Sequence, residues 1–182
     1  AGMVYLLTGP SHVGKTLLAQ RLMERYRHPY LSLDLLKMGF IRSGQTTLTP
    51  EEDDRLREYL WPIVRELIKT AIENDQNLIV EGILIPLNWT EDFDERYLGK
   101  IRGCCLVMTP AYVERHFDDI LRFANVVEHR LEDSGCTKES ALEDNARCLE
   151  LCRRYGCPCL VIGNDYERTL EQAISLLEEA GC

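Results

Sequence analysis

The sequence lacks a long hydrophobic run. No stretch approaches the roughly 20 consecutive apolar residues that a membrane-spanning helix needs. We also expect no signal peptide, since Met3 leads directly into a strand-like run at residues 4–7. We therefore expect a cytoplasmic protein that makes no membrane contact.

Positive charge is also scarce. The 182 residues include 21 Lys and Arg against 30 Asp and Glu, which gives a formal net charge of −9 and a pI of about 5.0. An acidic surface repels a nucleic-acid backbone, so DNA and RNA are disfavoured as partners. A small anion is not excluded, because local dipoles and a few cations can hold it. The length predicts a single domain, residues 1–182.

Paired C-x-x-C motifs are absent, although the chain has eight Cys. A disulfide scaffold is uncommon in a cytosolic α/β domain of this size. Cys104 and Cys105 are adjacent in an apolar run, so we expect them on opposite faces of a strand. We interpret the thiols as small buried hydrophobic groups. The alternative is a zinc site, which could be drawn through Cys148, Cys152, Cys157 and Cys159.

Short apolar runs alternate with helical patterns along the chain. The expected strands are residues 4–8, 30–33, 77–81, 101–108 and 159–162. The expected helices are residues 15–25, 49–73, 110–121, 137–155 and 166–179. A helix start is indicated by Thr49, Pro50 and Glu52. A kink in that helix is expected at Pro62, and a later helix is expected to end at Gly156. The pattern predicts an α/β fold, with a parallel sheet covered by helices on both faces.

One motif carries a specific chemistry. Residues 9–16 match G-x-x-x-x-G-K-[ST], between an expected strand and an expected helix. The glycines allow successive N–H groups to face a phosphate, and the helix N-terminus adds partial positive charge. Lys15 would meet the β- and γ-phosphates, and the Thr16 hydroxyl would ligate Mg2+. The motif thus predicts ATP and Mg2+ as ligands. The candidate nucleotide-binding residues are Gly9, Pro10, Ser11, His12, Val13, Gly14, Lys15, Thr16 and Leu17.

Two acids follow expected strands. Asp34 comes just after the run 30–33, and Glu81 ends the run 77–81. Ligands of parallel sheets bind at the carboxyl ends of the strands, so both acids should lie near the phosphate loop. We expect Glu81 to hold the Mg2+ shell and Asp34 to accept the proton of a substrate hydroxyl. The alternative for Asp34 is a cap of the helix that contains residues 35–38.

These motifs resemble the small P-loop kinases: nucleoside monophosphate kinases, 2-phosphoglycerate kinase, chloramphenicol phosphotransferase and zeta-toxin-like kinases. Residues 81–86 are similar to the E-G-x-x-x-P run of 2-phosphoglycerate kinase. Asp34 and Lys37 resemble the D-x-x-R motif of adenylate kinases, with Lys in place of the Arg that binds the acceptor phosphate. The resemblance implies a five-stranded sheet in the order 2-3-1-4-5, ATP as the donor, and acceptor contacts around Lys37 and Arg42.

The resemblance also implies an arginine-bearing lid, at about residues 115–136. Its candidates are Arg115, His116, Arg122 and Arg130. We expect Arg122 and Arg130 to act on the charge of the transferring phosphoryl group. Each Arg could instead form a surface pair with a nearby acid. In such kinases the loop at residues 163–165 borders the adenine, which makes Asn164 a further nucleotide-binding candidate.

The sequence thus predicts an ATP-dependent phosphotransferase with a small-molecule acceptor. The alternatives are a nucleoside monophosphate kinase and a nucleotide-binding ATPase without transfer activity. A GTPase is disfavoured, because the chain has neither Asn-Lys-x-Asp nor Asp-x-x-Gly after the third strand. Neither the acceptor nor the oligomeric state is readable from the sequence.

Overall fold

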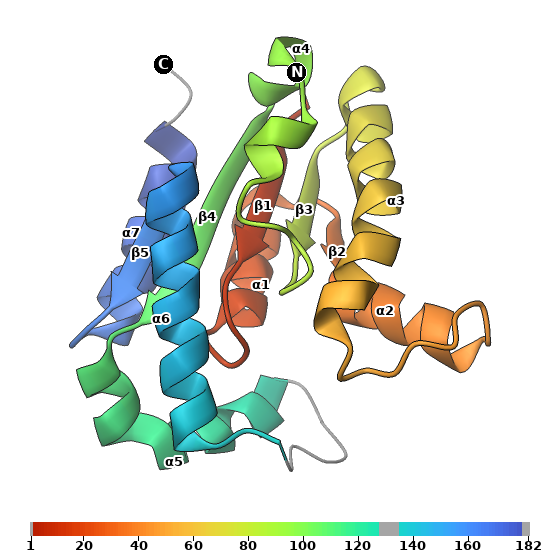
Figure 1. Ribbon diagram of the computed structural model, residues 1–182. Helices are drawn as coiled ribbons and strands as arrows, with labels where there is room; N and C mark the ends of the chain where they lie inside the picture. The colour runs from red at the N-terminus through yellow and green to blue at the C-terminus, as the bar shows by residue number, and fades with distance from the viewer. Residues whose placement is uncertain (1, 128–134, 180–182) are drawn as a thin grey trace.

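A computed structural model of the chain describes residues 2–127 and 135–179 (Figure 1). The strands are β1 (Val4–Thr8), β2 (Tyr30–Ser32), β3 (Leu78–Glu81), β4 (Ile101–Met108) and β5 (Cys159–Ile162). The helices are α1 (Lys15–Tyr26), α2 (Leu33–Arg42), α3 (Asp53–Glu73), α4 (Glu95–Leu98), α5 (Pro110–Val127), α6 (Lys138–Tyr155) and α7 (Tyr166–Glu179), with a 3-10 turn η1 (Trp89–Asp92).

All strand pairs are parallel, and the sheet order is β2-β3-β1-β4-β5. Both the five-stranded parallel sheet and its order are therefore confirmed. The central strand β1 pairs with β3 on one side and β4 on the other, which places Leu7 opposite Glu81 and Cys104. The carboxyl ends of the strands share one edge of the sheet, where the loop after β1, helix α2 and helix α5 all lie (Figure 1).

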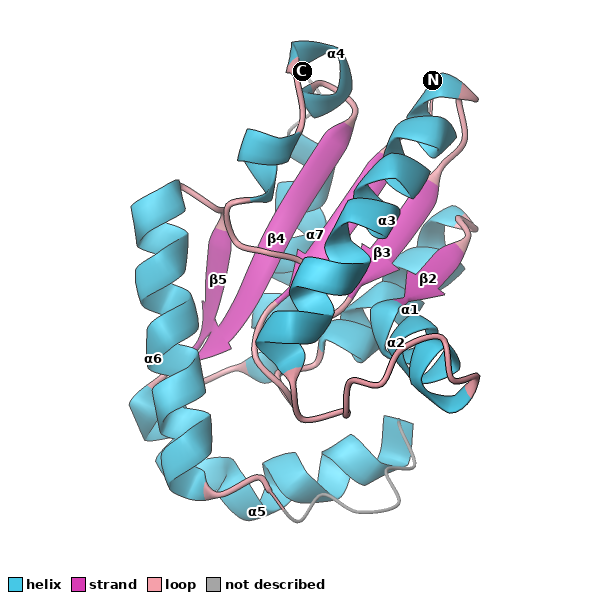
Figure 2. Ribbon diagram, turned by 45° about the vertical axis from the view of Figure 1, so that its right-hand side comes forward, coloured by secondary structure: helices cyan, strands magenta, loops and turns pink. Residues whose placement is uncertain are grey.

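Helices cover both faces of the sheet, because the strand side chains on both faces are apolar. Leu7 and Leu106 belong to the core under α1 and α7, whereas Leu6 and Val80 belong to the core under α3. Helix α6 covers β4 and β5 on the same face as α3 (Figure 2). Among the helices of the described ranges, none combines the length and apolarity that a bilayer span requires.

The two adjacent cysteines of β4 point to opposite faces, as expected. Cys104 belongs to the core under α1 and α7, and Cys105 belongs to a separate small core under α6. Burial raises the pKa of the Cys104 thiol to about 12, so this thiol stays protonated and packs as a small apolar group.

The predicted start of the third helix is wrong. Helix α3 begins at Asp53 rather than just after Thr49. The Thr49 N–H does donate to Glu52 Oε2 at 2.8 Å, as a capping box requires, and Glu52 N–H donates to Thr49 O at 3.1 Å. These bonds close a separate turn, since Glu52 has ψ 55°, outside the helical region. The helix after β4 also ends later than expected, at Val127.

Candidate active site

The phosphate loop joins β1 to α1 and has a backbone that only glycine allows at two positions. Gly9 has φ 141°, and a Cβ there would lie 2.3 Å from Leu106 O. Gly14 has φ 97°, and a Cβ there would overlap the Tyr166 hydroxyl. His12 also has a positive φ, 67°. Such alternation turns successive N–H groups into a concavity that suits an anion.

Lys15 is enclosed by this loop. Its side chain is buried, with 8% of the residue exposed, and its Nζ donates to Pro10 O at 2.6 Å. A buried ammonium is costly unless acceptors or an opposite charge lie close to it, and the Pro10 carbonyl is the acceptor that the loop provides. The arrangement collects positive charge at the N-terminus of α1, where an anion is most stable.

Thr16 and Glu81, the two residues expected to hold Mg2+, lie in contact beside the loop. Thr16 Oγ1 donates to Glu81 Oε1 at 3.4 Å, and Glu81 is only 3% exposed. Gly82 lets the chain after β3 pass Leu33, because a Cβ on Gly82 would lie 2.7 Å from Leu33 Cβ. A hydroxyl and a carboxylate at this spacing are two oxygen ligands of the kind that Mg2+ takes.

Tyr30 was missed by the sequence reasoning. Its hydroxyl donates to Glu81 Oε2 at 2.6 Å, whereas Thr16 donates to Oε1 of the same carboxylate. Burial raises the pKa of Tyr30 well above its ordinary value, and the charge of Glu81 raises it further. The hydroxyl therefore remains a donor. A polar ring at the start of the neighbouring strand was the available signal, since β2 pairs with β3 through Tyr30 and Ile79.

Asp34 lies in the first turn of α2, at the same edge of the sheet. It is not the cap of this helix: the cap is Ser32, whose Oγ accepts from Leu35 N at 3.4 Å. The Asp34 side chain is 33% exposed, and its Oδ1 lies 3.8 Å from Lys37 Nζ. The capping alternative is thereby removed.

Lys37 lies between two acids, and the second was not predicted. Its Nζ lies 3.7 Å from Asp53 Oδ1. That oxygen is buried and accepts no hydrogen bond from any described residue. Burial raises the pKa of Asp53, against the lowering effect of Lys37 and Arg57. A buried carboxylate with a raised pKa and an oxygen without a hydrogen bond is a candidate functional residue.

Arg57 is a second residue that was missed. It lies one helical turn after Asp53, and its guanidinium donates to Ile83 O at 3.0 Å in the loop that follows β3. It also pairs with Asp54 at 3.0 Å. The expected helix 49–73 already contained Asp53 and Arg57, and their spacing of four residues, which puts both on one face, was the available signal.

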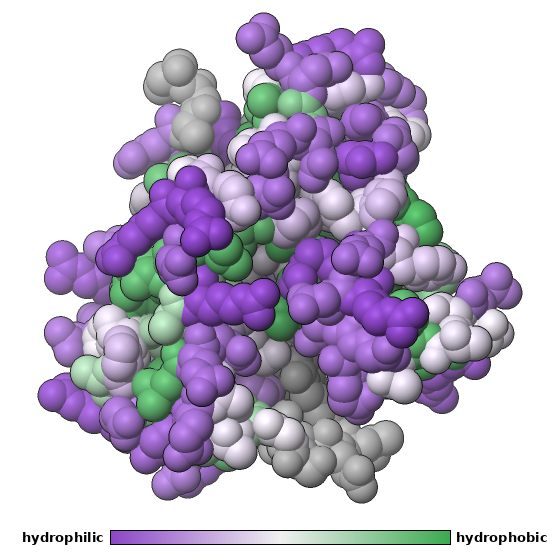
Figure 3. Space-filling model, in the orientation of Figure 1, coloured by the Kyte–Doolittle hydropathy of each residue, from purple (hydrophilic) through white to green (hydrophobic). Residues whose placement is uncertain are grey.

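Helices α3 and α6 bound the site from two sides. Burial raises the pKa of Asp144 on α6, and the charge of Asp53 on α3 adds to the shift. The Cys148 thiol of α6 is close enough to feel the charges of Lys15 and Arg57. Figure 3 shows hydrophilic residues gathered over the start of α3 on this face of the molecule. The phosphate loop therefore opens between a polar α2–α3 side and α6.

The remaining predicted residues lie further out. Arg42 is exposed at the end of α2, and Asn164 is exposed between β5 and α7. Arg115 and Arg122 are exposed on α5, and Arg122 lies 3.8 Å from Asp119. Arg130 lies outside the described residues, as does part of the expected lid. Helix α5 crosses the carboxyl edge between α6 and α2 (Figure 2).

Tyr166 completes the floor of the site. Its hydroxyl donates to Val13 O at 3.5 Å, and burial raises its pKa to about 12. The phenol therefore stays neutral beneath the loop, and α7 supports the loop conformation directly. Leu17, in the first turn of α1, is half-buried.

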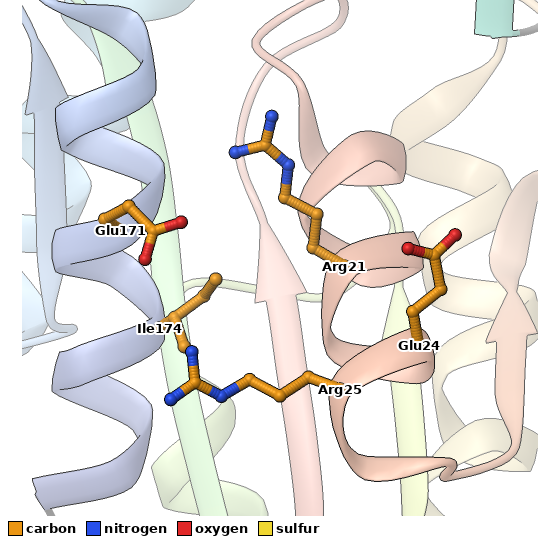
Figure 4. Close-up of a pocket in the computed structure, with 5 residues that line it drawn as sticks. All are labelled: Arg21, Glu24, Arg25, Glu171 and Ile174. Atoms are coloured by element: carbon orange, nitrogen blue, oxygen red, sulfur yellow. The ribbon is translucent and has the colours of Figure 1, made fainter.

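A surface pocket elsewhere lies apart from this chemistry. It is lined by side chains of α1 and α7 and has a volume of about 340 Å³ (Figure 4). Its two arginines are already paired, Arg21 with Glu167 at 2.8 Å and Arg25 with Glu178 at 3.0 Å. We assign it to packing between the two helices.

The chain matches no protein-family model, and a comparison with curated proteins finds no relative. Solved structures do resemble it. A gluconokinase from Sinorhizobium meliloti 1021 has a TM-score of 0.59 and 14% identity, over 99% of this chain and 93% of that one. A shikimate kinase from Bacteroides thetaiotaomicron has a TM-score of 0.56 and 15% identity, over 98% and 99%. A putative kinase from Chloroflexus aurantiacus J-10-fl has a TM-score of 0.55 and 20% identity, over 97% and 98%. The chain therefore shares its fold with these kinases.

Proposed function

We propose that this protein is a Mg2+-dependent kinase that transfers the γ-phosphoryl group of ATP to a hydroxyl of a small-molecule acceptor. The observation that carries the proposal is the enclosed Lys15 of the phosphate loop with the Thr16–Glu81 pair beside it. A loop of this shape holds phosphates, and the adjacent oxygens suit a divalent cation.

The phosphate loop and its neighbours would bind the phosphates and Mg2+ through separate groups. The N–H groups of residues 11–16 would hold the phosphate oxygens, and Lys15 would turn from the Pro10 carbonyl to the β- and γ-phosphates. Thr16 and Glu81 hold Mg2+, while Tyr30 keeps the Glu81 carboxylate oriented. When bound there, Mg2+ would offset the negative charge that develops on the phosphates.

The acceptor side is formed by α2 and the start of α3. Asp34 is exposed enough for a substrate hydroxyl to reach it, and it takes the proton of that hydroxyl as phosphorus transfers. Lys37 positions Asp34, and Arg57 supplies a planar cation for an anionic group of the acceptor. The gluconokinase and shikimate kinase that resemble this chain are named for acids that carry hydroxyl groups. Hydroxy acids are therefore our preferred acceptor class.

Helix α5 is proposed to carry part of a lid. Arg115 and Arg122 lie two turns apart on it and are exposed at the carboxyl edge of the sheet. A closing helix would bring a guanidinium to the γ-phosphoryl group and exclude water from it. Arg130 would act in the same way.

A transfer screen tests the proposal. The protein is incubated with Mg2+ and ATP labelled in the γ-phosphoryl group, together with hydroxy acids, sugars or nucleoside monophosphates. We expect labelled product from the hydroxy-acid group, none without Mg2+, and none from Lys15→Ala. Product from nucleoside monophosphates alone would favour the adenylate-type alternative. ATP binding without any labelled product would favour a nucleotide-binding module.

A further inference from the structure

Three thiols converge under α6, away from the phosphate loop. The sulfur atoms of Cys105, Cys152 and Cys159 all lie within 4.8 Å of one another. Cys105 and Cys152 are buried, at 0% and 2% exposure. Within the described ranges, no other cluster of potential metal ligands of this kind is found. The residues come from β4, α6 and β5, so only the folded chain brings them together.

Backbone hydrogen bonds fix the three segments in place. Cys105 and Cys159 are register partners on adjacent parallel strands, so their side chains share a face. Cys105 N–H donates to Pro158 O at 2.8 Å, and Cys157 N–H donates to Cys152 O at 3.0 Å. The thiols are therefore held together by the fold, before any ligand is considered.

A fourth thiol lies next to this group. The Cys157 thiol is close enough to raise the pKa of the Cys152 thiol, as are the thiols of Cys105 and Cys159. Cys157 is 6% exposed and belongs to the same small core. Three clustered thiols, with Cys157 beside them, offer the four sulfur ligands of a structural zinc site. The sequence alternative used Cys148 and lacked Cys105, because spacing along the chain cannot show which strand pairs with β5.

Few side chains of helix α6 are fully buried. It is 18 residues long, yet its buried residues are only Asn145 and Cys152. The buried residues of the core beneath it are Val107 and three cysteines. A helix that covers a sheet ordinarily buries branched aliphatic side chains in this position. Small thiols bury little apolar area, so this core alone gives weak attachment.

We propose that Cys105, Cys152, Cys157 and Cys159 bind one Zn2+ ion, which fastens α6 to the β4–β5 edge of the sheet. Tetrahedral Zn2+ with Zn–S bonds of about 2.3 Å sets sulfur atoms roughly 3.8 Å apart. The sulfur atoms of Cys105, Cys152 and Cys159, within 4.8 Å of one another, would therefore have to approach by at most about an ångström, and Cys157 would move in to complete the site. A disulfide would need a much closer approach, about 2.05 Å, and would use only two thiols. Zinc binding releases the thiol protons to solvent.

The site would act on the position of α6 and not on phosphoryl transfer itself. Asn145 of α6 accepts from Met108 N at 2.7 Å, at the end of β4. Asp144 and Cys148 of the same helix face the phosphate-loop side. Attaching α6 at Cys152 thus fixes the position of one side of the candidate active site. The zinc proposal does not depend on the kinase proposal, because its test measures metal binding and not phosphoryl transfer.

Metal content and cobalt spectroscopy test the proposal. Full-length protein from zinc-supplemented medium is analysed for metal, and apoprotein is titrated with Co2+. We expect one Zn2+ per chain, strong sulfur-to-cobalt charge-transfer absorption, and the visible bands of tetrahedral Co2+. Zinc loading should raise the melting temperature by about 5 °C or more. No retained zinc and no charge-transfer band would overturn the proposal, as would a disulfide among these cysteines by mass spectrometry in freshly purified protein.

Variants separate ligands from packing. Cys105→Ser and Cys159→Ser should lower zinc affinity at least a hundredfold, measured by competition with a chromophoric chelator. Cys104→Ser is the matched control, because it lies next to Cys105 in β4 but faces the other core. It should keep one Zn2+ per chain. Should Cys105→Ser fail to fold, the half-buried Cys159 supplies the decisive variant. Equal affinity in Cys104→Ser and Cys159→Ser, whether high or low, would contradict the assignment.

Discussion

Thr16 and Glu81 are 65 residues apart in the chain, yet the hydroxyl of one donates to the carboxylate of the other at 3.4 Å. The contact joins the first turn of α1 to the end of β3. Tyr30 holds the second oxygen of the same carboxylate at 2.6 Å. Three elements thus position one buried acid beside the phosphate loop.

Glu81→Gln should weaken the Mg2+ dependence selectively. The amide keeps the size of the side chain but loses the charge that attracts the cation. We expect the Mg2+ concentration for half-maximal transfer to rise at least tenfold, with ATP binding in the absence of Mg2+ changed by less than threefold. Tyr30→Phe should give a smaller shift in the same direction. An unchanged Mg2+ titration in Glu81→Gln would remove the carboxylate from the metal shell.

Gly14→Ala tests the shape of the loop. An added Cβ would overlap the Tyr166 hydroxyl, and the φ of 97° is strained for Ala. We expect ATP affinity to fall at least tenfold and the melting temperature to drop. The double variant Gly14→Ala with Tyr166→Phe should recover stability only in part, because the backbone strain remains. Complete recovery would show that the clash alone matters.

Asp34→Asn and Ser32→Ala form a matched pair on α2. Ser32 is the helix cap, so its loss should cost about 1 kcal/mol of stability and leave transfer nearly intact. Asp34→Asn should leave stability unchanged and reduce transfer about a hundredfold, the usual contribution of a general base. Urea unfolding and initial rates give both quantities. A loss of stability in Asp34→Asn with a nearly normal transfer rate would show that Asp34 has a structural role.

Asp53 predicts a pH dependence of stability. Its pKa is raised in the folded chain by burial, so the folded state favours the protonated form. This contribution is fully present below the unfolded pKa of about 3.9 and is lost as pH rises through the folded value. Asp53→Asn should therefore be more stable than the wild type at pH 7, with the difference vanishing toward pH 4. A melting-temperature difference that is independent of pH would contradict the burial argument.

Local patterns were sufficient for most of the fold. The strands β1, β4 and β5 and the helix α7 begin and end where the apolar periodicity places them, and the phosphate-loop glycines adopt the required backbone. The predicted start of α3 is wrong because the hydrogen bonds between Thr49 and Glu52 form a capping pattern that does not continue into a helix.

The missed site residues depend on pairing across the fold. Tyr30 reaches Glu81 only because β2 lies beside β3, and Arg57 reaches Ile83 only because α3 packs near the carboxyl end of β3. Cys105 joins Cys152 and Cys159 only through the β4–β5 pair and α6. Spacing along the chain carries none of these contacts.

The transfer rate of Lys15→Ala is the most direct test of phosphoryl transfer from ATP by this protein. The variant removes the cation enclosed by the loop and leaves the N–H groups of the loop in place. With the best acceptor from the screen, we expect the initial rate of labelled product to fall by about a thousandfold or more, while circular dichroism shows a folded chain. Transfer by Lys15→Ala within tenfold of the wild type would contradict the account.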